Sequence, residues 1–180
     1  MASELYVETL KGLTSGANAN KVIIPSGQTL DASSGGFTTP AGHVIQVVQQ
    51  VLATQTDSTS TTMIDTGLSA SITPSSTSSK ILVTVNHRTF KNSAAQGMDM
   101  QLLRDSTNLG EIVRGHMYDG TTGEINSAVT FCYLDSPSTT SSVTYKTQFS
   151  HNNGNGGTIR VCGDSSGGGR DFITLMEIAG

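Results

Sequence analysis

The sequence predicts an all-β chain: an antiparallel β-sandwich, jelly-roll-like in topology, that follows an extended N-terminal leader. Apolar and polar residues alternate in KILVTV, AVTFCYL and VTYKTQF, which is typical of strands with one face on a core and one on solvent. Clusters of Gly, Ser, Thr, Asn and Pro separate such segments, and no window keeps a helical period. Eight or nine strands in about 140 residues fit a two-sheet sandwich.

The leader, residues 1–40, differs from the rest of the chain. Its two apolar stretches, LYVETL and KVIIP, are short, and Pro25 and Gly27 prevent the second from being a central strand. Because it cannot bury a core alone, we expect it to attach to another chain or to wind with copies of itself in a fibre. The linker SSGGFTTPAG then separates two domains, 1–40 and 41–180. The candidate attachment residues are Leu5, Tyr6, Val7, Leu10, Val22, Ile23 and Ile24.

From His43 onward, strand signals recur at short intervals. The turns between them, such as PSSTSS, DGTTG and NNGNG, are rich in residues that accept positive φ, fix φ or bond back to the backbone. The expected strands cover residues 43–54, 61–73, 79–91, 97–105, 108–118, 124–135, 142–151, 157–162 and 171–179.

Composition and charge argue against several classes of function. Charged residues make up 13% of the chain, about half the roughly 25% of an average globular domain. The net charge is −4 and Lys and Arg are scattered singly, so we expect no nucleic-acid partner. HVIQVVQQVLA is too short and too polar to cross a bilayer, and the N-terminus lacks the pattern of a signal peptide, so we expect no membrane insertion.

The two cysteines, Cys132 and Cys162, lack metal-ligand spacing. Both are interpreted as small apolar residues on inward strand faces. A disulfide between them stays open as an alternative, although a chain made in a reducing cytosol would not depend on it.

The string VCGDSSGGGRD comes within one residue of the nucleophile loop of chymotrypsin-like serine proteases. The extra serine would displace either hydroxyl, of Ser165 or of Ser166, from the oxyanion amides. No histidine lies in the Ala-Ala-His-Cys setting of that family, and only one expected strand follows. We therefore interpret Asp164–Arg170 as an exposed, flexible connection that tolerates insertion and carries no chemistry.

Paired carboxylates offer no better catalytic site. Asp99 with Asp105 and Glu111 with Asp119 are the close pairs in sequence, and along a strand they would be about 20 Å or more apart. A solvated strand face is the better interpretation.

Other polar groups also favour ordinary structural roles. His116 and Asp119 would lie on opposite strand faces, which argues against a metal site, and His87 is interpreted as an exposed strand residue rather than a sugar-binding or interface residue. The glycine-rich PSGQTLDASSGG lacks the helix that a phosphate-binding loop needs. We expect no catalytic residue, no cofactor and no metal, and hence no enzyme.

Several segments together resemble short tail-fibre-like or virion-associated structural proteins of tailed bacteriophages, especially marine and cyanobacterial phages. They are the leader ELYVETLKGLTSGANANKVIIPSGQTLDASSG, PAGHVIQVVQ, ITPSSTSSKILVTV, FCYLDSPSTTSSVTYKTQF and the ending ITLMEIAG. The leader and the ending are the specific parts, and residues 86–125 match least. The resemblance implies a trimeric virion component whose leader attaches to the particle, and it supplies no catalytic residue.

We therefore expect a short trimeric fibre or spike in the virion, made in the host cytoplasm and anchored through its leader. A capsid decoration (cement) protein and a glycan-binding module stay open as alternatives. The expected partners are further copies in a homotrimer, other virion proteins (tail, fibre adaptor or capsid) and a host-surface glycan. The loop residues expected to face the host or a partner are Asn92, Gln96, Asp119, Thr121, Asn152 and Asn153.

Overall fold

The computed structural model describes residues 14–16, 26–27, 40–52, 54–154, 156–161 and 171–180. The chain divides into two units, Met1–Thr38 and Thr39–Gly180. Every strand of the described residues lies in the second unit. The expected role of residues 1–40 in attachment stays a prediction.

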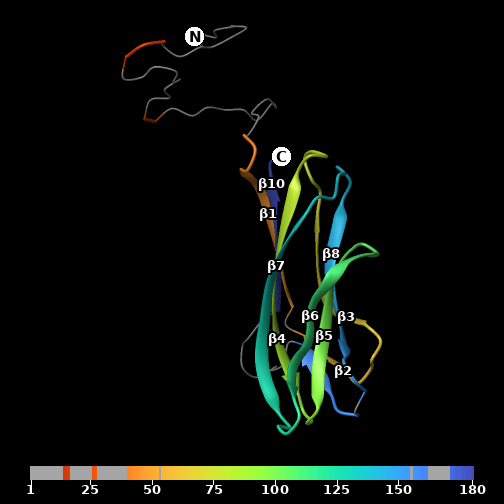
Figure 1. Cartoon of the computed structure of the whole chain (residues 1–180). Coiled ribbons are helices and arrows are strands. Elements are labelled where there is room, and N and C mark those ends of the chain that lie inside the picture. The colour runs from red at the N-terminus through yellow and green to blue at the C-terminus, as the bar shows by residue number, and fades with distance from the viewer. Residues whose placement is uncertain (1–13, 17–25, 28–39, 53, 155, 162–170) are drawn as a thin grey trace. The chain divides into compact units, whose positions relative to one another are not determined.

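The second unit is built from β-strands alone within its described residues (Figure 1). Nine strands correspond to the nine that the sequence predicts, with ends that differ by a few residues. Thr56–Ser58 was not predicted, because three polar residues show no alternation. The strands are β1 Val44–Leu52, β2 Thr56–Ser58, β3 Ile64–Ile72, β4 Lys80–Lys91, β5 Gln96–Arg104, β6 Thr107–Asp119, β7 Ile125–Asp135, β8 Val143–His151, β9 Ile159–Val161 and β10 Asp171–Ile178.

The strands form two antiparallel sheets. In sheet A the order is β1-β10-β4-β7, and the short strands β9 and β2 extend it beside the far half of β4. In sheet B the order is β3-β8-β5-β6. Successive long strands alternate between the sheets except β5 and β6, which are neighbours in sheet B; this is the two-Greek-key order of a jelly roll, so the predicted fold is confirmed.

The core lies between the two sheets. Strand β4 shows why: its alternate residues Ile81, Val83 and Val85 are fully buried, while their neighbours are half-buried on the other face. Leu175 of β10 and Leu102 of β5 belong to the same apolar cluster. Each such side chain contributes about 1.5–3 kcal/mol by leaving water.

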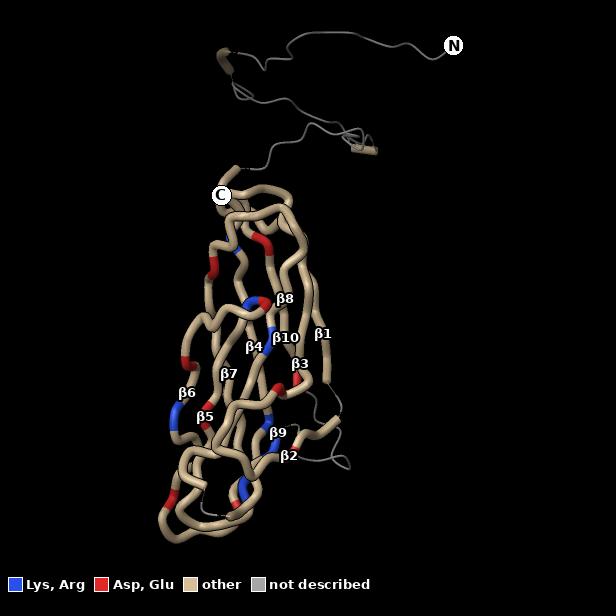
Figure 2. The backbone as a smooth tube through the Cα atoms, turned by 90° about the vertical axis from the view of Figure 1, so that its right-hand side faces the viewer, with Lys and Arg blue, Asp and Glu red and all other residues tan. Residues whose placement is uncertain are grey.

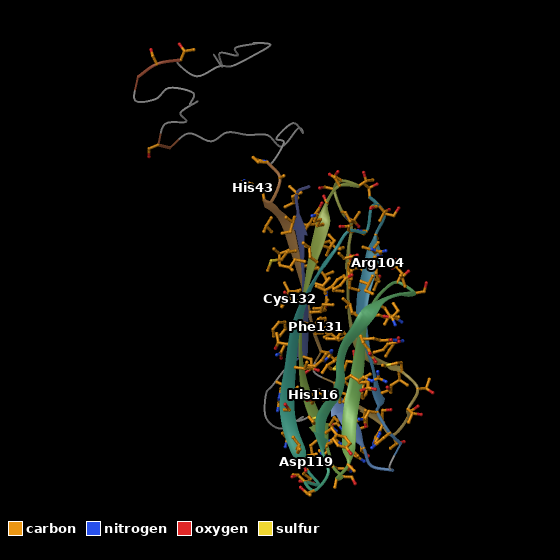
Figure 3. The ribbon with its side chains drawn as sticks, in the orientation of Figure 1. His43, Arg104, His116, Asp119, Phe131 and Cys132 are labelled. Carbon is orange, nitrogen blue, oxygen red and sulfur yellow. The ribbon has the colours of Figure 1, made fainter. Side chains whose placement is uncertain are left out.

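The chain enters and leaves the sandwich at one end, which we call the entry end. The amide of Gly42 donates to the carbonyl of Ala179 (2.7 Å), and the amide of Ala179 donates to the carbonyl of His43 (2.8 Å). The connections β4–β5, β6–β7 and β8–β9 lie at the opposite end, the distal end, as Figure 3 shows by the positions of His43 and Asp119. The distal connections are therefore the part of the second unit that lies furthest along the strands from Gly42 and His43.

Candidate interaction surfaces

The distal connections are tied to one another by side chains that the sequence singles out. Asn92, after β4, donates its backbone N–H to the carbonyl of Thr158 (3.2 Å) and accepts from the Thr158 amide through its Oδ1 (2.7 Å). This reciprocal pair joins the β4–β5 connection to the β8–β9 connection. Asn92 is exposed, but its amide oxygen is occupied.

Two further asparagines complete this tie. The side-chain Oδ1 of Asn152 accepts from the backbone N–H of Gly97 (3.0 Å), and the backbone N–H of Asn152 donates to the carbonyl of Gly97 (3.0 Å). Asn153 donates its side-chain amide to the carbonyl of Ala95. The structure thus brings Asn92, Asn152 and Asn153 together at the distal end, where they order the loops.

The β6–β7 turn is fixed by Asp119. Its Oδ1 accepts from the amides of Thr121 (2.8 Å) and Thr122 (2.6 Å) and from the Thr121 hydroxyl (3.0 Å). These bonds stabilise the carboxylate and hold the pKa of Asp119 well below its usual range. Thr121 is exposed beside it. Whether Asp119 and Thr121 contact a partner stays a prediction.

The prediction that Gln96 is a partner-facing loop residue is wrong. Gln96 begins β5 and is fully buried, because β5 starts earlier than the sequence suggests. Both polar atoms of its side-chain amide lack a hydrogen-bond partner among the described residues.

Buried polar groups fill the interior near the distal end. Lys91 is fully buried and donates from Nζ to the carbonyl of Asp119 (3.3 Å). His116 Nε2 lies 3.0 Å from the Thr89 hydroxyl, and His151 Nδ1 accepts from two backbone amides. Burial lowers the pKa of His116, and it lowers the pKa of His151 although Asp99 opposes the effect.

The prediction that His116 and Asp119 lie on opposite faces of their strand is also wrong. They pair with Met98 and Gln96, two residues apart on β5, and so lie on one side of the sheet. An irregularity in the β5–β6 ladder and a positive φ at Met117 (64°) reset the alternation. Within the described residues no group of three His, Cys, Asp or Glu could hold a metal ion.

His87 is buried rather than exposed, contrary to the sequence prediction. Its Nδ1 lies 2.6 Å from Asp171 Oδ2, and its Nε2 lies 2.8 Å from Thr147 Oγ1. Hydroxyl, imidazole and carboxylate follow one another as in a hydrolase triad. All three residues are 0% exposed, so a substrate could not reach the hydroxyl. The arrangement instead links β4 and β10 of sheet A to β8 of sheet B.

The outward face of sheet A carries an unexpected apolar surface, which we call the apolar face. One row of paired residues crosses all four long strands: Val47, Met176, Leu82 and Leu134. Val47 is 56% exposed and Leu134 is 52% exposed, and the two between them are half-buried. The apolar face comprises Val44, Val47, Val51, Leu82, Cys132, Leu134, Phe172, Met176 and Ile178.

The prediction that Cys132 points inward is wrong as well. Cys132 pairs with Thr84, and its Sγ lies 3.5 Å from the Thr84 hydroxyl. The thiol is free and exposed on the apolar face (Figure 3). The sequence held a signal for this face, because DFITLMEI and FCYL are apolar on both strand faces.

The outward face of sheet B, the polar face, has the opposite character. A chain of hydrogen bonds crosses its four strands: Gln148 donates to Asp65 (2.6 Å), Gln101 to Gln148 (2.7 Å) and Asn108 to Gln101 (2.7 Å). Lys146 adds an ion pair to Asp65 (3.0 Å). Burial raises the pKa of Asp65, but the bonds from Gln148 and Lys146 outweigh it and lower the pKa overall.

A small groove of about 190 Å³ opens at the seam between β6 and β7. Leu102, Leu109, Ile112 and Phe131 line it together with the partly exposed Tyr133. Glu111 and Cys132 also border the groove, so its lining is mixed rather than purely apolar.

Other sequence predictions fall outside the described residues. The candidate attachment residues Leu5 to Ile24 belong to this group, as do Cys162 and the connection Asp164–Arg170. Within the described part of the chain, no helix is long and apolar enough to cross a membrane.

Comparisons with known proteins give fold-level similarity of low degree. No protein-family model matches the chain, and no curated protein matches it. Among solved structures, the VP2 subviral particle of infectious bursal disease virus is similar at 15% identity and a TM-score of 0.42, over 87% of this chain. The Gt strain of the same virus gives 12% identity and a TM-score of 0.41, over 86%. The chain spans 42% and 40% of these two chains. Scores this low carry no argument about function.

Proposed function

We propose that this chain is a structural protein of a virion, a short trimeric fibre or spike anchored through residues 1–40. The jelly roll is displayed, and its distal loops contact the host surface. The resemblance of the leader and of the ITLMEIAG ending to tailed-phage structural proteins motivates the proposal.

One structural observation carries it: the chain enters at one end of the jelly roll, and the loops predicted to face a partner gather at the other. The bonds between Gly42, His43 and Ala179 fix the entry end. The bonds that Asn92, Asn152 and Asn153 make hold the distal loops in one arrangement. Ordered loops lose less conformational entropy on binding, which favours recognition there.

The apolar face also suits the alternative role of a capsid decoration protein, because a protein that joins capsid subunits needs a surface for contact with its neighbours. Copy number separates the two roles. Quantitative mass spectrometry of purified particles should give a few dozen copies for fibres and hundreds for decoration.

The test of the proposal is incorporation into particles. An antibody raised against residues 40–180 should label purified virions at discrete positions. Deletion of residues 1–37 should abolish incorporation while the jelly roll still folds. Incorporation that survives this deletion would refute anchoring through the leader, and absence of the chain from virions would refute the proposed function.

A further inference from the structure

We propose that the apolar face of sheet A is the contact between copies of this chain. The inference deepens the proposed function, because it places the subunit contact of the expected homotrimer on named residues. Its occupants are the same faces of further copies of this chain, which converge on the three-fold axis.

The first argument is that apolar side chains are exposed here with no charged residue between them. Four of the seven large apolar side chains that are exposed in the described residues lie on this face, namely Val44, Val47, Val51 and Leu134. Strand β1 has no charged residue, as Figure 2 shows. The acidic residues of β10, Asp171 and Glu177, are buried on the inward side. Lys80, paired with Ile178, and Arg88 lie on the same outward side, so charge is confined to the two ends of the face. The rows between them are uncharged and can meet a copy without like-charge repulsion.

The second argument is that the polar groups of the face are already paired with one another. Gln49 donates to the Thr174 hydroxyl (2.9 Å), and Asn86 donates to the Thr130 hydroxyl (2.7 Å). Burying a polar group is costly when its hydrogen bonds are lost. Covering this face leaves these bonds intact, so the desolvation cost of an interface here is small.

The third argument is extent. Four strands at about 4.8 Å spacing and a strand of nine residues at about 3.3 Å per residue give a footprint of roughly 570 Å². A standard protein interface covers about 800 Å² of each partner in accessible area, which is larger than a flat footprint for the same contact. The face is therefore of the right size for a stable contact between copies.

The fourth argument is the position of the face relative to the leader. The face begins at Val44, four residues after Pro40, where the described second unit starts. Copies whose leaders are held together in a particle have their β1 strands tethered to one another through residues 1–43. Tethering raises the effective concentration of the faces, so it strengthens in the particle a contact that the free chain already forms.

The edge of β1 adds to the same contact. On one side β1 pairs with β10, and among the described strands none pairs with its other side. Residues 44–51 of this edge are valine, isoleucine and glutamine with no charge, and such an edge is a site at which another chain adds or associates. The polar face has no comparable combination, because the outward residues of its edge strand β3 include Asp65, Ser69 and Ser71.

The test compares three full-length variants with the wild type by sedimentation equilibrium. Val47→Lys and Leu134→Lys place a charge on the two ends of one row of the apolar face. Ser71→Lys is the matched control, because Ser71 is also exposed and outward-facing, on the edge strand β3 of the polar face. The urea midpoint of each variant confirms that it is folded.

We expect the wild type and Ser71→Lys to sediment as an oligomer, and Val47→Lys and Leu134→Lys to shift to the single-chain mass of 18.7 kDa. A monomeric wild type, or folded Lys variants on the apolar face that keep the oligomeric mass, would overturn the inference. Incorporation of the wild type into virions is scored separately. A chain that enters particles but does not associate through this face would leave the proposed function standing and remove the inference.

Discussion

Two rows of side chains, one on the outer face of each sheet, show that the two outer faces differ in polarity. On sheet A, Val47, Met176, Leu82 and Leu134 form an apolar row across four strands. On sheet B, Asp65, Gln148, Gln101 and Asn108 form a hydrogen-bonded row across four strands. Both sheets bury the same core between them, so this difference is not required by the fold.

The contrast separates the inward-facing residues, which stabilise the sandwich, from the outward-facing residues, which determine what its surface can contact. Antiparallel sheets that face water on one side usually carry polar side chains on that side. An apolar outer face with exposed valines and leucine gains nothing in an isolated domain, and it is typical of a surface that meets another protein. Our proposal therefore gives sheet A two contacts, one with sheet B and one with another copy of the chain.

The largest effect is expected from the link that joins the two sheets. Asp171→Ala leaves His87 Nδ1 and the Arg88 amide without their buried acceptor. We expect the free energy of unfolding to fall by about 2–6 kcal/mol, because two buried donors each lose their acceptor. Urea unfolding measures it. The control Asp57→Ala removes an exposed carboxylate of sheet A and should lose at most about 1 kcal/mol. Equal losses for the two variants would show that the buried link contributes no more stability than the exposed ion pair.

Next in size are the inward faces, where the two sheets should behave alike. Leu175 of sheet A and Leu102 of sheet B are both buried in one apolar cluster. Leu175→Ala and Leu102→Ala should each lower the free energy of unfolding by about 2–5 kcal/mol, through lost burial and a residual cavity. The oligomeric state of the folded fraction should stay unchanged in both. A change of assembly on Leu175→Ala alone would break the division between core and outer face.

Acidification should weaken the distal half of the sandwich. Because burial lowers the pKa of His116 and His151 below the ordinary 6.5, the unfolded chain binds protons that the folded chain does not. Stability is therefore complete above pH 6.5 and falls as the pH drops below it. Asp57, Asp65 and Glu177, whose pKa values are lowered, lose their contributions only at more acidic pH. The urea midpoint should be lower at pH 5.5 than at pH 7.5, and less so in His151→Gln. A pH-independent midpoint would contradict this.

The smallest effect is expected on the polar face itself. Lys146→Gln removes the ion pair to Asp65, whose side chains are 29% and 52% exposed. The loss should be about 0.2–1 kcal/mol, as for exposed pairs, and it should vanish in 1 M salt. Thermal unfolding at low and high salt checks it. A larger loss that salt does not screen would mean that the polar face contributes to the free energy of unfolding through more than exposed ion pairs.

The sequence predicted the fold because the inward-facing residues alternate strictly in strands such as β4 and β8. It missed β2, whose three residues are held by pairing with β9 rather than by their own pattern. It placed Gln96, His87 and Cys132 wrongly, because a strand end, a buried polar link and an apolar outer face each depend on partners distant in sequence. The gathering of Asn92, Asn152 and Asn153 at one end could not be read from the chain either, since it follows from the jelly-roll topology.

The central claim is that the apolar face is covered by another copy, and the thiol of Cys132 reports on it directly. The chain has two cysteines, so Cys162→Ser leaves Cys132 as the single reactive group. Its labelling by a small maleimide can be followed by mass spectrometry, in this protein and in the same protein with Val47→Lys added.

We predict slow labelling of Cys132 in the assembled protein and labelling at least tenfold faster when Val47→Lys separates the copies. Dilution below the dissociation constant should give the same increase without any substitution. Fast labelling of Cys132 in both proteins, at every concentration, would contradict the claim that this face is the contact between copies.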